Sequence, residues 1–190
     1  MELRSIKVFG DCYEPDKYHL HNYMFDTTAI NKLVERPDDI ELLMKASEEL
    51  GYEYFRCRIQ DGEIIGMKSD GSFHKDFSRD SEKSIKMRET IKTLSIRKIP
   101  CLAAFVQRGI TLNGTSYLAD SSGKRLEVFE RVFSANSENI EDAIIVESGI
   151  HHNCIIVSND KAMCDNTRAI FPGKAIWYKR FIGSIKEKLI

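Results

Sequence analysis

One stretch decides the fold: 138-ENIEDAIIVESGIHHNCIIVSND-160. Behind Asp142 its apolar residues recur at helical spacing, and residues 154–157 then form an apolar run too short for a helix. The stretch therefore predicts a helix that opens at Asp142, a tight turn, and a buried strand that closes at Asp160. Ligands collect at the carboxyl edge of a parallel sheet, so we expect the two aspartates to converge there.

Two segments nearer the N-terminus repeat this arrangement of a strand followed by an acid. The segment 23-YMFDTTAINKL-33 predicts a core strand, then Asp26, then a helix whose first turn a threonine can cap. In that position the helix dipole would stabilise the charge of Asp26. The segment 52-YEYFRCRIQDGE-63 predicts a second strand that delivers Glu63 in the first turn of the next element.

The rest of the chain alternates between strand-like and helix-like segments. We expect helices at 37–50, 81–95, 124–133 and 181–189, strands at 6–9, 99–106 and 175–178, and loops at 66–80 and 111–123. No structural role is evident for the polar residues 10–18. The alternation predicts an α/β sandwich with a parallel sheet.

Size and composition fit one domain. The chain has 190 residues, a mass of 21.8 kDa and 42% hydrophobic residues, which is enough for one core. Its formal net charge of -1 gives no evidence for a nucleic-acid partner, so such evidence must be local. Five cysteines without a Cys-x-x-Cys pair indicate free thiols in a reducing cytoplasm. No segment has the length of a membrane helix, so we expect a cytoplasmic protein without a membrane partner.

The four acid-bearing segments resemble the PIN-domain family of metal-dependent nucleases. The similarity covers roughly residues 23–66 and 137–180, and includes the sequence Ser-Asn-Asp-Lys at 158–161. It implies a three-layer α/β/α sandwich with a central, mainly parallel sheet of about five strands. It also implies a single PIN-like domain over residues 1–190, with a variable helical or irregular insertion at about 67–136.

The resemblance implies a nuclease that hydrolyses phosphodiester bonds with a metal-activated water. Asp26, Asp142 and Asp160 would bind Mg²⁺ or Mn²⁺, and Glu63 would bind the ion or orient a water, because hard divalent cations prefer oxygen ligands. Any one of these acids alone is better explained as a helix cap or loop residue. Together they would crowd like charges into one cleft, which is costly unless a cation is bound.

Small polar residues beside the acids are candidates for substrate binding. Ser158 and Asn159 resemble the polar pair that precedes the last acid of the family, and Ser158 would bond a phosphate or a water. Ordinary turn chemistry at the end of a strand explains them about as well. Thr27 is at least a cap residue, and a phosphate contact would be an additional role.

A basic segment spans residues 68–98 and includes Lys83, Lys86 and Lys92. Such a cluster can follow a phosphate backbone, although a charge run is usually a solvated helix face. Because it lies close in sequence to Glu63, we favour nucleic-acid binding by this segment. For the nuclease that the resemblance implies, we expect RNA as the substrate in preference to DNA. The insertion at about 67–136 is longer than in the minimal toxin nucleases of the family, so an antitoxin partner is not implied. A homodimer stays open, since related domains often dimerise.

Three other functions are compatible with parts of this sequence. A phosphatase of the haloacid-dehalogenase type would also use Asp26, but it requires a second aspartate where this chain has Thr28. A catalytically silent PIN-like protein that binds nucleic acid or another partner would usually have lost one of the four acids. A zinc site that combines His151, His152, Cys154 and Cys164 is disfavoured, because the chain lacks paired ligand spacing and Cys154 lies in the apolar strand.

Overall fold

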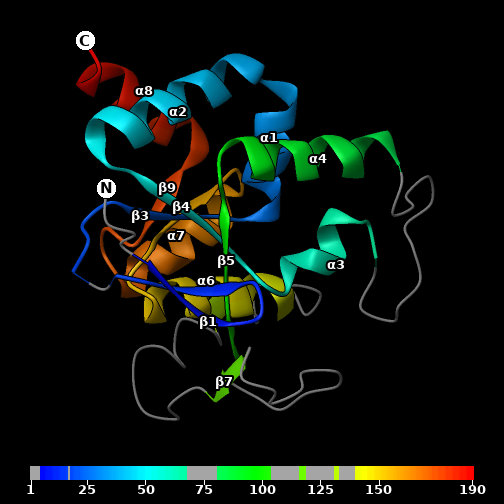
Figure 1. Cartoon of the computed structure of the whole chain (residues 1–190). Coiled ribbons are helices and arrows are strands. Elements are labelled where there is room, and N and C mark those ends of the chain that lie inside the picture. The colour runs from blue at the N-terminus through cyan, green and yellow to red at the C-terminus, as the bar shows by residue number, and fades with distance from the viewer. Residues whose placement is uncertain (1–4, 17, 68–80, 104–115, 119–130, 133–139) are drawn as a thin grey trace.

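The computed structural model of the chain is shown in Figure 1. It describes residues 5–16, 18–67, 81–103, 116–118, 131–132 and 140–190. All but residues 131–132 of the predicted helix at 124–133, and most of the expected insertion at about 67–136, lie outside these ranges. No helix within them combines the length and apolar character that a membrane span requires.

A seven-stranded sheet forms the middle of the molecule, in the order β1-β2-β5-β4-β3-β8-β9. Its strands are β1 (Ser5–Phe9), β2 (Cys12–Pro15), β3 (Asn22–Phe25), β4 (Glu53–Cys57), β5 (Arg97–Ile99), β8 (Ile155–Ser158) and β9 (Ala175–Trp177). Within this sheet β1 pairs antiparallel with β2, and the other pairings are parallel. Beyond it, β6 (Cys101–Ala103) and β7 (Ser116–Leu118) form a separate parallel pair.

Helices cover both faces of the sheet, which confirms the three-layer α/β/α sandwich (Figure 1). The helices are α1 (Thr27–Glu35), α2 (Pro37–Leu50), α3 (Gln60–Ile64), α4 (Glu82–Thr93), α6 (Ile140–His151), α7 (Lys161–Ile170) and α8 (Tyr178–Lys188). One core layer contains residues of α1, α2, α4 and α8, and the other contains residues of α6 and α7. In β3, Tyr23 and Phe25 point into the first layer and Met24 into the second, as the alternation of a strand requires.

The sheet is wider than the predicted five strands because the N-terminal segment adds two. The polar stretch without a predicted role contains β2, which pairs with β5 at Cys12 and Lys98. Cys12 is fully buried there, so a tertiary contact outweighs the polar local sequence. The strand predicted at 99–106 is divided into β5 and β6, on either side of Pro100, which lacks the N–H that a ladder needs.

Helix α6 packs very closely on the sheet at Gly149. A Cβ atom added at this glycine would lie 2.5 Å from Met24 Cε and 3.0 Å from Ile156 Cγ1. Both neighbours are fully buried, so only the flexible methionine tip can move easily. The small residue in the last turn of this helix is therefore required by packing.

We expect Gly149→Ala to lower the free energy of unfolding by about 1 kcal/mol, since overpacking costs more than the gain in helix propensity. Gly183→Ala in α8 is the matched control, because an added Cβ there has no neighbour within 4 Å. The control should gain about 0.5–1 kcal/mol from helix propensity alone. Urea denaturation measures both variants, and equal stabilisation of the two would contradict the close approach of α6.

Candidate functional site

Asp26 lies between β3 and α1 and is 1% exposed. Its carboxylate caps α1 by accepting from Ala29 N at 2.7 Å, and it also accepts from Thr28 Oγ1 at 2.8 Å. Ser158 Oγ, at the end of β8, donates to it at 2.7 Å. Burial raises the pKa of Asp26 to about 6, although these hydrogen bonds act in the opposite direction. Three donors therefore hold the side chain in one orientation.

Asp160 lies beside Asp26 because β8 pairs with β3 in parallel register. It caps α7 by accepting from Met163 N at 3.0 Å, and its own N–H donates to Ser158 Oγ at 2.9 Å. The Ser158 hydroxyl is fully buried and connects the two aspartates. Asn159 contributes its backbone N–H, which donates to Thr28 Oγ1 at 3.0 Å. Thus Ser158 and Asn159 both make contacts that join the two strand ends.

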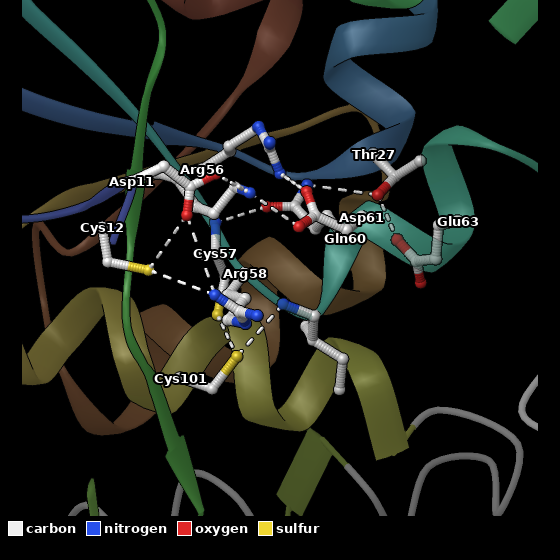
Figure 2. Close-up of polar contacts among 12 residues, drawn as sticks. Asp11, Cys12, Thr27, Arg56, Cys57, Arg58, Gln60, Asp61, Glu63 and Cys101 are labelled. Atoms are coloured by element: carbon white, nitrogen blue, oxygen red, sulfur yellow. Dashed lines mark hydrogen bonds and ion pairs between the residues drawn. The ribbon is translucent and has the colours of Figure 1, made fainter. Parts of the chain in front are cut away.

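Glu63 approaches from α3, and Figure 2 shows how it is held. Thr27 Oγ1 donates to its carboxylate and accepts from Gln60 Nε2 at 3.1 Å. Gln60 is fully buried; its amide also donates to Phe25 O at 3.1 Å and accepts from Cys57 N at 2.6 Å. Gln60 thus connects the ends of β3 and β4 and positions Thr27 against Glu63.

The first turn of α6 supplies Asp142 and its neighbour Glu141. Burial raises the pKa of Asp142 to about 7, and the charges of Asp26, Asp160 and Glu141 add to the effect. Burial likewise raises the pKa of Glu63 to about 7, opposed by Thr27 and reinforced by Asp142, Glu141 and Asp26. Acids on α3 and α6 and at the starts of α1 and α7 are thus close enough to repel one another.

This set of carboxylate oxygens suits a hard divalent cation such as Mg²⁺ or Mn²⁺. In the part of the chain that the structure describes, however, no three His, Cys, Asp or Glu side chains are grouped as a ready-made metal site. The acids are therefore close enough to repel one another but are not grouped around one point. Cation binding would require their side chains to move. Asp26 would have to exchange part of its hydrogen bonding, since three donors occupy it.

The basic helix α4 packs against α1 and α3. Lys86 pairs with Glu82 at 2.6 Å, and Lys92 is exposed. The pKa of Glu35 is lowered mainly by Lys32, and the charge of Lys83 adds to this effect. Glu35 ends α1, whereas the site lies at its beginning, so Lys83 is displaced along α1 from the acids. Residues 68–80 of the basic segment lie outside the described ranges.

The last two members of the basic segment belong to the sheet. Arg97 pairs with Glu53 at 3.0 Å, and Lys98 pairs with Asp11 at 2.5 Å and Asp61 at 2.7 Å. With side chains only 19% and 13% exposed, respectively, they serve as internal ion-pair partners. Their inclusion in a phosphate-binding surface is therefore unsupported.

One site residue, Glu141, had no place in the sequence prediction. Its charge acts on both Glu63 and Asp142, and the adjacent Glu-Asp pair at a helix start was the available signal for it. Thr28, a candidate cap residue, donates to Asp26 and accepts from the backbone N–H of Asn159. Asp165, five residues beyond Asp160 on α7, is exposed and pairs with Arg168, so it is a solvated helix residue.

No family model matches the chain, and no curated protein matches it. Among solved structures it is similar to that titled "Crystal Structure of PAE2754 from Pyrobaculum aerophilum", with 13% sequence identity and a TM-score of 0.46. That similarity covers 87% of this chain and 96% of the other. At such a TM-score it contributes nothing to a functional assignment.

Proposed function

We propose that this protein is a divalent-metal-dependent nuclease, with RNA as the first substrate class to test. One observation carries the proposal: Asp26, Glu63 and Asp142 come from separate elements, and burial raises the pKa of each, with a neighbouring acid adding to every one of the three shifts. Repulsion among buried carboxylates persists only when the rest of the fold holds them close together, and a bound cation would relieve it. The resemblance to PIN domains supports the same function.

Asp26, Asp142 and Asp160 would hold the ion, with Glu63 beside them. When bound, Mg²⁺ or Mn²⁺ makes water a better nucleophile and neutralises the leaving oxygen. The chain itself supplies orientation: Ser158 and the first turn of α1 fix Asp26. Glu63, whose pKa is raised to about 7, can accept a proton from an attacking water near neutral pH.

Catalysis is tested by cleavage of single-stranded and structured RNA and DNA with Mg²⁺, with Mn²⁺ and with EDTA. We expect cleavage with at least one ion and its complete loss with EDTA. Binding of nucleic acid without cleavage under every condition would instead favour the catalytically silent PIN-like binding protein. The binding protein is retained as the second candidate because no three His, Cys, Asp or Glu side chains among the described residues are grouped as a metal site.

Helix α4 offers a separate test of substrate binding. Charge reversal of Lys83, Lys86 and Lys92 should weaken RNA binding and make the slope of log K against log salt shallower by about 2, as expected for three lost phosphate contacts on a single strand. Fluorescence anisotropy with EDTA present measures both quantities without cleavage.

The matched control reverses three exposed lysines on other elements, Lys7, Lys45 and Lys186, and so changes the net charge equally. It should leave the slope closer to that of the wild type. An unchanged affinity and slope in the α4 variant would show that this helix is a solvated face only.

A further inference from the structure

Two buried cysteines meet beside the candidate site. Cys57 ends β4 and Cys101 begins β6, and their Sγ atoms lie 3.4 Å apart (Figure 2). Cys57 is fully buried and Cys101 is 6% exposed. A disulfide requires the sulfur atoms to approach by about 1.4 Å more, to a bond length of about 2.05 Å.

Chain topology explains why the two thiols meet. Cys57 is in register with Ile99 of β5, so Cys101, two residues later, lies just beyond the end of β4. Its sulfur accepts from the backbone N–H of Ile59 at 3.1 Å, within the connection between β4 and α3. Cys101 is thus held directly over the segment that leads to Glu63.

The surroundings favour reaction at Cys57. Burial alone would raise the pKa of the Cys57 thiol, but hydrogen bonding with Cys101, Ile59 and Ser148 and the charge of Arg56 together lower it. Thiolates are the reactive form of cysteine in oxidation and in thiol–disulfide exchange. The lowered pKa favours Cys57 as the attacking thiol, and Cys101, whose sulfur lies 3.4 Å away, is placed as its resolving partner.

A continuous chain of hydrogen bonds runs from this pair to the site. Cys57 N donates to Gln60 Oε1 at 2.6 Å, and Gln60 Nε2 donates to Thr27 Oγ1 at 3.1 Å. Thr27 in turn donates to Glu63. Any shift of Cys57 toward Cys101 therefore acts on the amide that positions Thr27 and Glu63.

We propose that Cys57 and Cys101 form a reversible dithiol–disulfide pair that controls the position of Glu63. The oxidant is a hydroperoxide such as hydrogen peroxide. The Cys57 thiolate attacks one oxygen, the O–O bond breaks, and hydroxide leaves to give a sulfenic acid. The Cys101 sulfur then attacks the Cys57 sulfur, the S–O bond breaks, and the departing hydroxide takes the Cys101 proton as water. Two thiols are oxidised, one peroxide is reduced to water, and an external dithiol reverses the bond.

Peptide mapping by mass spectrometry under non-reducing conditions tests the bond itself. After hydrogen peroxide treatment of the reduced protein, we expect a linked peptide pair containing Cys57 and Cys101, which dithiothreitol removes. Cys101→Ser should instead leave a sulfenic acid at Cys57 that dimedone traps. Cys154→Ser, which removes a buried thiol elsewhere, should keep the bridge. The proposal is overturned if wild-type protein forms no such bridge, or if its first bridge includes Cys12.

The effect on Glu63 rests on the proposed nuclease function and is tested separately. We expect oxidised protein to cleave RNA several-fold more slowly than reduced protein, with full recovery after dithiothreitol and no such response in Cys101→Ser. A bridge with unchanged cleavage overturns the link to Glu63. A bridge in a protein whose reduced form has no cleavage activity contradicts the nuclease proposal and leaves the thiol pair established.

Discussion

Asp142→Asn is expected to reduce metal-dependent cleavage by roughly 100-fold or more, equivalent to about 2.7 kcal/mol of transition-state stabilisation. Asparagine keeps the shape of the side chain but removes the charge that would help to hold the cation. It also removes a carboxylate that contributes to the raised pKa of Glu63. The measurement is the single-turnover cleavage rate with saturating Mg²⁺ or Mn²⁺.

Asp165→Asn is the control for this variant. The same chemical change is made there on an exposed carboxylate of α7 whose partner is Arg168. Cleavage by Asp165→Asn should stay within about twofold of wild type, because surface ion pairs contribute little. If both variants cleave at the wild-type rate, Asp142 has no catalytic role and the centre of the nuclease proposal is lost.

The acids at the helix starts could be predicted because local sequence determines them. Asp26 and Asp160 each follow a short apolar strand and precede a helix, and both cap that helix in the structure. Asp142 lies in the first turn of α6, as its position before the apolar run indicated. The parallel pairing of β3 with β8 then brings the first two acids together. A strand-then-acid pattern therefore predicts a site when the strands are neighbours.

Contacts between distant parts of the chain could not be predicted in this way. The polar segment around Cys12 shows little strand pattern, yet it joins the sheet by pairing with β5. Gln60 had no assigned role in the sequence, but its buried amide connects Cys57, Phe25 and Thr27. Each of these roles depends on a partner supplied by another element, so neither periodicity nor spacing could indicate it.

The metal-free protein should become less stable, relative to Asp142→Asn, as the pH rises from about 4 to about 8. Burial and neighbouring acids raise the folded-state pKa of Asp142 to about 7 from an ordinary 3.8. Between these values the folded state binds more protons than the unfolded state, so stability is lost as pH rises. Asp26 is 1% exposed, and its pKa is likewise raised, from 3.8 to about 6. Its ionisation lowers the free energy of unfolding by about 3 kcal/mol as the pH rises through that interval, in the wild type and in Asp142→Asn alike.

Denaturation in EDTA across this pH range measures the difference between the two proteins. We expect the variant to equal the wild type near pH 3, below the ordinary pKa of 3.8, where the Asp142 carboxyl is mostly protonated in both the folded and the unfolded state. Near pH 8 the variant should unfold at a higher denaturant concentration. A variant that is less stable than wild type at every pH would mean that Asp142 stabilises the start of α6 as an ordinary first-turn acid.

Addition of Mg²⁺ or Mn²⁺ at pH 8 should restore the stability of the wild-type protein and leave the stability of Asp142→Asn largely unchanged. A ligand that binds only the folded state contributes roughly 2.7 kcal/mol at a free concentration 100 times its dissociation constant. The cation would offset the repulsion among Asp26, Asp142 and Asp160, so its effect should be largest where these groups are charged and should vanish near pH 4. Melting temperatures with and without each ion give the result. A wild-type melting temperature that neither ion shifts at pH 8 would leave the four acids as crowded helix-start residues without a metal.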